Sequence, residues 1–409
     1  MTAMSLDIDR VRSRYPALRE GYAHFDGAAG TLVAARAAAA IADVTGGAVA
    51  NKSTAFAAGR RALAIVADAR SAIADLLGAV PEGVVFGQSA TSLTYLVART
   101  LAEGWGPGDD IVVSRLDHDA NVRPWVQAAG RVGATVRWAE FGPDTGALPV
   151  EQYHDLVGPR TRVVAVTGAS NAIGTMPDVA AIAAIARAAG AMTYVDGVHR
   201  TPHEPVDLAE LGADFYVTSA YKWSGPHLAT CVADPMLWEG LRPEKLVPSP
   251  DAVPERFEYG TLSFELLAGV TGAVDHIATL LTDGMPAPEP GSDRRARVLE
   301  SMAAVRAYEH RLFTTLLAGL AEIPGVSICP APAAGCPTVA FRVGDQHPGQ
   351  TAEILGDEGV CVFAGDYYAY EYFQAMGLRE SGGAVRASIY HYTTSGEVDR
   401  LVDAVKRCR

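Results

Sequence analysis

The sequence predicts an α/β fold, with a large, doubly wound, mostly parallel sheet domain and a smaller α+β C-terminal domain. First, Ala- and Leu-rich helical patterns alternate with short Val- and Ile-rich runs between about residues 60 and 235. Second, a proline-dense stretch at 286–292 cannot continue a helix and indicates a linker. Third, the chain has 409 residues, whereas single hydrophobic cores rarely grow beyond ~250–300 residues.

We therefore expect an N-terminal arm at 1–20, a large domain at 21–285 and a small domain at 286–409. Runs of β-branched and aromatic residues predict the strands. In the large domain these are 84–86, 111–113, 135–138, 163–166, 193–195, 215–217 and 230–233, the last as an antiparallel neighbour of the strand before it. Helical stretches such as 92–102 and 179–190 separate several of them. The small domain is expected to have strands at 338–343, 359–363 and 384–390 and helices at 294–320, 350–357 and 395–407.

The composition argues against several classes of function. A net charge of −13 and the lack of a basic run argue against binding to nucleic acid or to an anionic membrane surface. No uncharged apolar stretch reaches the ~18 residues of a membrane helix, and the N-terminus has no apolar signal core. The five cysteines are scattered without CxxC spacing, which indicates reduced thiols and neither a disulfide framework nor a metal site. We expect a cytoplasmic protein.

Two ionisable residues follow neighbouring strands of the predicted sheet. Asp196 ends the apolar run 191–195, and Lys222 comes shortly after the aromatic run 213–218. Only one crossover connection fits between the two strands, so they should be parallel neighbours whose carboxyl ends face one crevice. A solvated lysine and a turn aspartate are the ordinary alternative. If the two side chains converge, they suggest a cofactor aldehyde held by the lysine, with an acid partner for the cofactor's ring nitrogen.

Six motifs in a fixed order carry a resemblance to a known family. They are Phe-Asp-Gly-Ala-Ala at 25–29, His-Asp-Ala-Asn at 118–121, Ala-Ser-Asn-Ala-Ile-Gly at 169–174, Val-Asp-Gly-Val-His at 195–199, Ser-Ala-Tyr-Lys at 219–222 and Arg-Ala-Ser-Ile-Tyr-His-Tyr-Thr at 386–393. From about residue 20 onward the chain resembles the class V aminotransferase and cysteine desulfurase family, pyridoxal 5′-phosphate (PLP) enzymes of fold type I. The resemblance implies PLP as cofactor, an α-amino acid as substrate and a homodimer with a shared active site.

The resemblance also assigns roles around the cofactor ring. Lys222 would bind the cofactor aldehyde and shuttle protons, and Asp196 would pair with the pyridine nitrogen, so that the ring can accept electrons. His118 would stack on the ring as a catalytic residue. Asn171 and His199 would contact the phenolic oxygen. Position 199 usually holds Gln in cysteine desulfurases; a histidine there can still hydrogen-bond the phenolate, but its charge can titrate near neutral pH.

A helix N-terminus is expected to bind the cofactor phosphate through backbone N–H groups and hydroxyls. The stretch 88–91 precedes the expected helix at 92–102 and fits that place. Ala90 and Thr91 align with a Thr-Thr pair in relatives, so this chain lacks one of the two hydroxyls.

Two further segments complete the expected phosphate site. Ser219 would supply another hydroxyl, and Tyr221 replaces the usual histidine of the family. Gly260 and Thr261 align with a Gly-Thr pair that, in the family, reaches the phosphate from the partner subunit.

The substrate contacts implied by the resemblance include one clear departure from cysteine desulfurases. Arg386 aligns with the arginine that clamps the α-carboxylate through a bidentate pair, and Ala28 would also contact the substrate. The loop at 363–369 has Tyr368 where desulfurases have their nucleophilic cysteine, and a phenol with a pKa near ~10 cannot carry a persulfide. We expect Cys361 to be a core thiol and Tyr368 to face the substrate, as a hydrogen-bonding or proton-transfer group.

These residues predict a PLP-dependent enzyme that converts an α-amino acid through an external aldimine and a quinonoid. The favoured reaction is a C–S or other Cβ/Cγ elimination without a persulfide relay. Epimerisation and transamination share the first intermediates, and no motif separates them. A non-catalytic PLP-binding protein and a lysine Schiff-base aldolase without PLP are the alternatives from other classes. The cations at 52, 60, 123 and 200 hint at a carboxylate on the substrate side chain.

Overall fold

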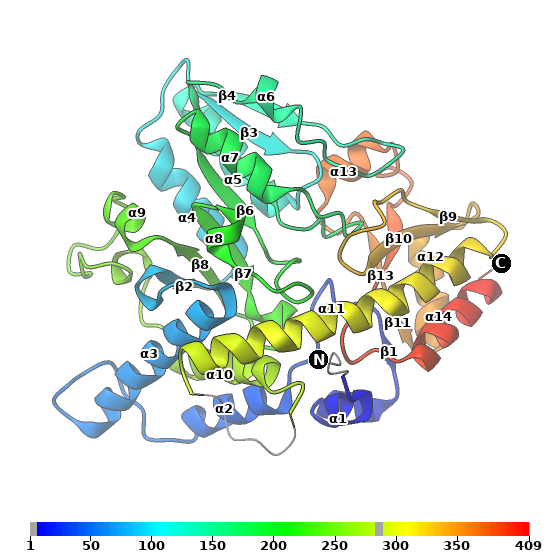
Figure 1. Cartoon of the computed structure of the whole chain (residues 1–409), viewed down its shortest axis with the longest axis horizontal. Coiled ribbons are helices and arrows are strands. Elements are labelled where there is room, and N and C mark those ends of the chain that lie inside the picture. Colours follow the sequence, from blue (N-terminus) through cyan, green and yellow to red (C-terminus); the bar gives the residue numbers. More distant parts are fainter. Residues whose placement is uncertain (1–5, 283–288, 409) are drawn as a thin grey trace.

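A seven-stranded sheet forms the centre of the larger part of the molecule (Figure 1). The computed structural model describes residues 6–282 and 289–408. The strand order is β2-β8-β7-β6-β5-β3-β4, with β2 (Val84–Gly87), β3 (Asp110–Ser114), β4 (Thr135–Ala139), β5 (Thr161–Thr167), β6 (Met192–Asp196), β7 (Phe215–Ser219) and β8 (Ala229–Ala233). In this sheet β8 pairs antiparallel with both neighbours, and the other pairs are parallel. These strands confirm the prediction, including the antiparallel β8.

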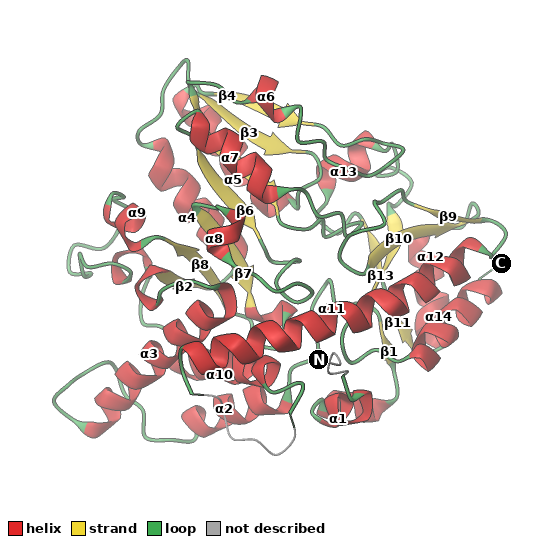
Figure 2. Ribbon diagram, in the orientation of Figure 1, coloured by secondary structure: helices red, strands yellow, loops and turns green. Residues whose placement is uncertain are grey.

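Helices cover both faces of this sheet, as Figure 2 shows. Side chains alternate along each strand, so Val84 and Phe86 of β2 join one core and Val85 joins the other. The first core is closed by α3 (Ala57–Leu77), α7 (Val179–Ala188) and α10 (Phe264–Ala278), and the second by α4 (Ala90–Ala102) and α5 (Arg123–Val132). The doubly wound architecture is therefore confirmed. Shorter or peripheral helices are α1 (Ile8–Ser13), α2 (Ala35–Thr45), α6 (Tyr153–Leu156), α8 (Leu208–Leu211) and α9 (Pro235–Glu239).

A four-stranded antiparallel sheet organises the C-terminal part. Its order is β12-β13-β10-β9, with β9 (Val326–Ile328), β10 (Thr338–Val343), β12 (Phe363–Gly365) and β13 (Ala384–Ser388). The helices of this part are α12 (Pro348–Asp357), α13 (Tyr370–Ala375) and α14 (Ser395–Arg407). The long helix α11 (Ser292–Ala321) crosses the molecule and packs against α10 and α3 on one side and α14 on the other (Figure 1).

The structure divides one predicted strand in two. The segment expected as a single strand at 359–363 forms β11 (Val360–Cys361) and contributes only its last residue to β12. The division arises because β11 pairs in parallel with β1 (Ala23–His24), whereas β12 pairs with β13. Of the predicted linker, residues 286–288 lie outside the described residues, and 289–291 lead into α11. No helix in the described ranges is long and apolar enough to cross a membrane.

The two strands that carry the predicted lysine and aspartate are parallel neighbours. Val195 and Asp196 of β6 lie opposite Tyr216 and Val217 of β7. Asp196 is the last residue of β6, and Lys222 ends a short 3-10 turn that follows β7 directly. The carboxyl ends of both strands therefore face the same side of the sheet, as the sequence predicts.

A substitution at Gly197 can test how tightly this edge of the sheet is packed. A Cβ at position 197 would lie 1.9 Å from the buried Tyr216 ring. We expect Gly197→Ala to destabilise the protein by about 1–3 kcal/mol, because overpacking forces the neighbouring side chains to move. The measurement is the thermal unfolding midpoint. Gly130→Ala is the matched control, since its Cβ would meet nothing within 4 Å, and an unchanged midpoint for Gly197→Ala would contradict this packing.

Candidate active site

A pocket of about 580 Å³ lies at the carboxyl ends of β6 and β7. Both sheets contribute to it, because Arg386 of β13 lines it together with Asp196 of β6 and Ser219 of β7. Most of the sequence-predicted residues line this pocket: Ala28, Ala90, Thr91, His118, Asn171, Asp196, His199, Ser219, Tyr221, Lys222, Tyr368 and Arg386. Gly260 and Thr261 are exposed and do not line it.

Lys222 is held as a buried amine with a lowered pKa. Its Nζ donates a hydrogen bond to the Ala28 carbonyl and lies 4.9 Å from the centre of the Tyr221 ring. Burial, followed by the positive charge of Arg386, lowers the pKa of Lys222 to about 7, although Asp196 opposes the shift. About half of this amine is therefore neutral near pH 7, which is the form that attacks an aldehyde.

Asp196 supplies a carboxylate on the same pocket wall. Its Oδ1 accepts a hydrogen bond from the Val198 N–H at 3.0 Å. Burial raises the pKa of Asp196 to about 6, and this N–H and the charge of Lys222 limit the rise. The group is mainly ionised at neutral pH and can pair with a protonated ring nitrogen.

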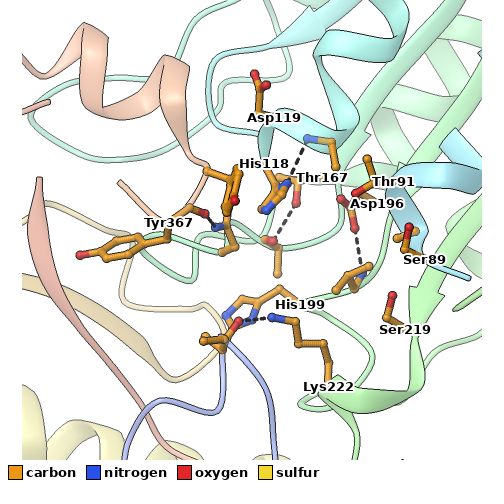
Figure 3. Close-up of a pocket in the computed structure, with 18 of the residues that line it drawn as sticks. Ser89, Thr91, His118, Asp119, Thr167, Asp196, His199, Ser219, Lys222 and Tyr367 are labelled. Atoms are coloured by element: carbon orange, nitrogen blue, oxygen red, sulfur yellow. Dashed lines mark hydrogen bonds between the residues drawn. The ribbon is translucent and has the colours of Figure 1, made fainter. Parts of the chain in front are cut away.

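The start of α4 forms an anion-binding end of the pocket. Ser89 caps the helix by accepting a hydrogen bond from the Ser92 N–H, while Ala90 and Thr91 occupy the first two helical positions, whose N–H groups have no acceptor within a helix. The sequence predicts that Thr91 precedes the helix, but it lies in the first turn of α4. The side chains of Ser89, Thr91 and Ser219 gather at one side of the pocket in Figure 3. Hydroxyls and free N–H groups at a helix N-terminus suit a phosphate.

His118 and His199 are both neutral imidazoles. The Nδ1 of His118 accepts from the Ala120 N–H at 3.0 Å, and burial lowers the pKa of His118 to about 3. The Nε2 of His199 is 2.9 Å from the Thr338 hydroxyl, and burial lowers the pKa of His199 well below its usual value. The lowered pKa argues against titration of His199 near neutral pH, because the ring is buried where Thr338 of β10 meets it.

Arg386 is a buried cation that no carboxylate neutralises directly. It is 3% exposed, and none of the ion pairs among the described residues involves it. Its Nη1 donates to the Asn171 carbonyl at 2.8 Å, its guanidinium lies 4.5 Å from the centre of the Tyr367 ring, and its Nε has no hydrogen-bond partner. A buried charge of this kind is costly unless a counter-ion binds. A ligand carboxylate would satisfy it.

The other cations give no support for a second anion contact. Arg123 lines the pocket, but it forms ion pairs with Glu371 and, at 2.7 Å, with Asp119. The cations at 52, 60 and 200 do not line the pocket. The sequence-based hint of a carboxylate on the substrate side chain is therefore not supported by these residues.

None of the residues that line the pocket is a cysteine. Cys361 lies in β11, half-buried, and burial raises the pKa of its thiol. Tyr368, at the position that the resemblance assigns to the desulfurase nucleophile, does line the pocket.

Sequence reasoning assigned no role to several lining residues, among them Tyr95, Thr167 and Phe363. Tyr95 follows Thr91 by one helical turn, so helical spacing could have placed it on the same face. Thr167 ends β5, and its position at a strand end was the available signal. Phe363 falls where the predicted strand 359–363 meets the loop 363–369, and its place in the pocket depends on the pairing of β12 with β13, which no local pattern indicates.

Comparisons with known proteins identify the family and the fold of the chain. The aminotransferase class-V family matches residues 23–232 and 296–401. An uncharacterised protein of Mycobacterium tuberculosis is 34% identical over 98% of this chain and 99% of its own length. A probable cysteine desulfurase of Pseudomonas aeruginosa is 32% identical over 85% of this chain and 84% of its own. The crystal structure of the cysteine desulfurase CsdA of Escherichia coli has a TM-score of 0.85 at 26% identity, covering 98% of both chains.

The chain belongs to the aminotransferase class-V family, and its fold is fold type I of the PLP-dependent enzymes. PLP is the cofactor of that family. The residues of this pocket fit it, because a buried amine of lowered pKa, a carboxylate and a helix N-terminus with hydroxyls surround one cavity. Lys222 would hold its aldehyde, Asp196 its ring nitrogen, and Ser89, Thr91 and Ser219 its phosphate.

The rate at which the cofactor-free protein takes up PLP should depend on pH through Lys222. Only the neutral amine reacts, so the rate should rise with pH and reach half its maximum near the pKa of about 7. Removing the positive charge with Arg386→Leu should raise this pKa and move the midpoint to higher pH. The measurement is stopped-flow absorbance at several pH values.

Arg162→Leu is the control, because Arg162 pairs with Asp109 away from the pocket and should leave the midpoint unchanged. A midpoint near pH 10 in the unaltered protein, the ordinary value for lysine, would contradict the proposed state of Lys222.

Proposed function

We propose that this protein is a PLP-dependent enzyme that acts on an α-amino acid and catalyses an elimination at Cβ or Cγ, including C–S cleavage, without a persulfide relay. The observation that carries the proposal is the combination within one pocket of Lys222, Asp196 and an unneutralised Arg386 without a cysteine. The family relationship supports PLP as the cofactor. The residues of this pocket support elimination without a persulfide relay.

Each of these side chains has a distinct task in the proposed reaction. When bound, PLP withdraws electrons from the Cα of the amino acid. Arg386 holds the substrate carboxylate and so fixes which bond at Cα faces Lys222. The Nζ of Lys222, largely neutral above pH 7, can take the Cα proton and later return it to product. Asp196 keeps the ring nitrogen protonated and thereby sustains the electron withdrawal.

The absence of a cysteine in the pocket leaves hydrogen sulfide or another free leaving group as the expected co-product, with no sulfur held on the protein. Elimination from a cysteine derivative would release the protonated leaving group, and hydrolysis of the remaining enamine by one water molecule would give ammonia and a 2-oxo acid. The proposal does not require any of the five cysteines of the chain.

Product analysis tests this directly. The protein loaded with PLP is incubated with cysteine, cystine, O-acetylserine, homocysteine and alanine, and 2-oxo acids, ammonia and sulfide are measured. We expect release of a 2-oxo acid from at least one substrate with a leaving group and none from alanine. Lys222→Ala should lower the rate by at least ~1,000-fold, since proton transfer and cofactor attachment are both lost.

Cys361→Ser is the decisive companion variant and should keep full activity. Loss of activity in Cys361→Ser, or trapping of a persulfide on it, would contradict elimination without a relay. Racemised amino acid, or amino-group transfer to an added 2-oxo acid, would identify the reaction as epimerisation or transamination.

We further propose that the active enzyme is a homodimer, in which Gly260 and Thr261 of each subunit complete the phosphate site of the other. Both residues are exposed and lie outside the pocket of their own chain. A positive φ of 77° at Gly260 shapes the turn that presents Thr261.

Thr261→Val should therefore weaken PLP binding by about 10–100-fold, because a hydrogen bond to a charged group contributes ~1.5–3 kcal/mol. PLP affinity is measured by quenching of protein fluorescence, and subunit number by analytical ultracentrifugation. Thr314→Ala, on the exposed face of α11, is the control. A monomer that binds PLP with unchanged affinity after Thr261→Val would refute the shared site.

A further inference from the structure

Two large aromatic side chains are exposed where they line the pocket. Phe363 and Tyr368 are 45% and 73% exposed, and both line the pocket. Phe363 lies next to Arg386, whose guanidinium is 5.8 Å from the centre of its ring. Exposed aromatic surface inside a pocket is unfavourable in water and commonly marks a place where a ligand binds.

The loop that carries these two residues lies away from the phosphate-binding end. In Figure 3, Tyr367, the buried neighbour of Tyr368, lies at the opposite side of the pocket from Ser89, Thr91 and Ser219. Because the cofactor phosphate would occupy the hydroxyl-lined side, the substrate lies between Lys222 and Arg386. Phe363, beside Arg386, and Tyr368, stacked on His118, form the aromatic wall of this pocket, toward which the side chain of the substrate would extend.

The backbone of this wall is strained and firmly held. Tyr367 and Tyr368 have φ values of 47° and 60°, a left-handed conformation that large side chains rarely adopt. The Tyr367 carbonyl accepts from Asn171 Nδ2 at 2.9 Å, and the Tyr368 carbonyl accepts from the Asp119 N–H at 2.7 Å. Such strain persists where the surroundings enforce it and concentrates at functional sites. Here it fixes the Tyr368 ring, stacked at 5.5 Å on His118.

The charges around this wall are already paired within the chain. Asp119 binds Arg123 at 2.7 Å, and Asp366 binds Arg379 at 3.2 Å. Glu371 binds both Arg115, at 2.6 Å, and Arg123. A charged substrate side chain would lose its hydration here and find no free counter-ion among these residues.

We infer that the substrate is an α-amino acid with an aromatic, uncharged side chain, which packs against Phe363 and Tyr368 while its carboxylate binds Arg386. The inference rests on the proposed function and specifies its substrate class. Flat rings against Tyr and Phe gain apolar burial and a favourable aromatic pairing, which an acidic or a small side chain does not.

Binding of amino acids that cannot undergo elimination tests the inference. Phenylalanine, aspartate and alanine carry no substituent at Cβ that leaves as an anion, so the initial change that each causes in the visible absorption of the PLP-loaded protein reports binding without elimination. We expect phenylalanine to bind at least ~10-fold more tightly than aspartate or alanine. Tyr368→Ala should weaken the binding of phenylalanine by ~10-fold more than that of alanine, while Tyr368→Phe keeps the preference for phenylalanine.

Tyr22→Ala is the matched control, because this tyrosine is 46% exposed but lies outside the pocket. Tighter binding of aspartate or alanine than of phenylalanine would overturn the inference and leave the proposed function standing. An equal loss for all three amino acids in Tyr368→Ala would show a structural role only and would also overturn it. If no amino acid alters the absorption of the loaded protein, the proposed function fails together with the inference.

Discussion

The site depends on three charges buried close enough to influence one another, those of Lys222, Asp196 and Arg386. Burial alone would keep Lys222 neutral and Asp196 protonated. Their mutual attraction opposes both shifts, and the charge of Arg386 lowers the pKa of Lys222 further. The result is an amine with a pKa of about 7 beside a carboxylate with a pKa of about 6. Both groups are thus close to the protonation states that binding and proton transfer require at neutral pH.

The fold brings these charges together from two sheets. Asp196 and Lys222 come from adjacent parallel strands, so their relative position follows from the register of β6 and β7. Arg386 comes from the antiparallel sheet and reaches the pocket only because the two parts of the chain pack together. Its hydrogen bond to the Asn171 carbonyl fixes that contact at the site itself. Any change in how the two sheets pack should therefore alter the pKa of Lys222 as well as substrate binding.

Local patterns were enough to predict the large sheet and the convergence of Asp196 and Lys222 at one edge of it, whereas most other pocket residues were implied by the family resemblance. Strands such as β5 and β6 are β-branched runs that need little context, and the loops after them carry the motif residues. The features that the sequence did not predict depend on contacts between residues far apart in the chain. Pairing of β11 with β1, far away in the chain, divides a predicted strand, and Thr338 of β10 buries His199. The charge of Arg123 is neutralised by Glu371, a partner that no local pattern could indicate.

The most direct test of the central claim is to locate the lysine that binds PLP. The chain has four lysines, at positions 52, 222, 245 and 406. PLP is added to the protein, the covalent bond is fixed by borohydride reduction, and the modified peptide is identified by mass spectrometry. The account predicts a phosphopyridoxyl group at Lys222, with the visible absorption band lost in Lys222→Ala. Modification only at another lysine, or an unchanged band in Lys222→Ala, would contradict it.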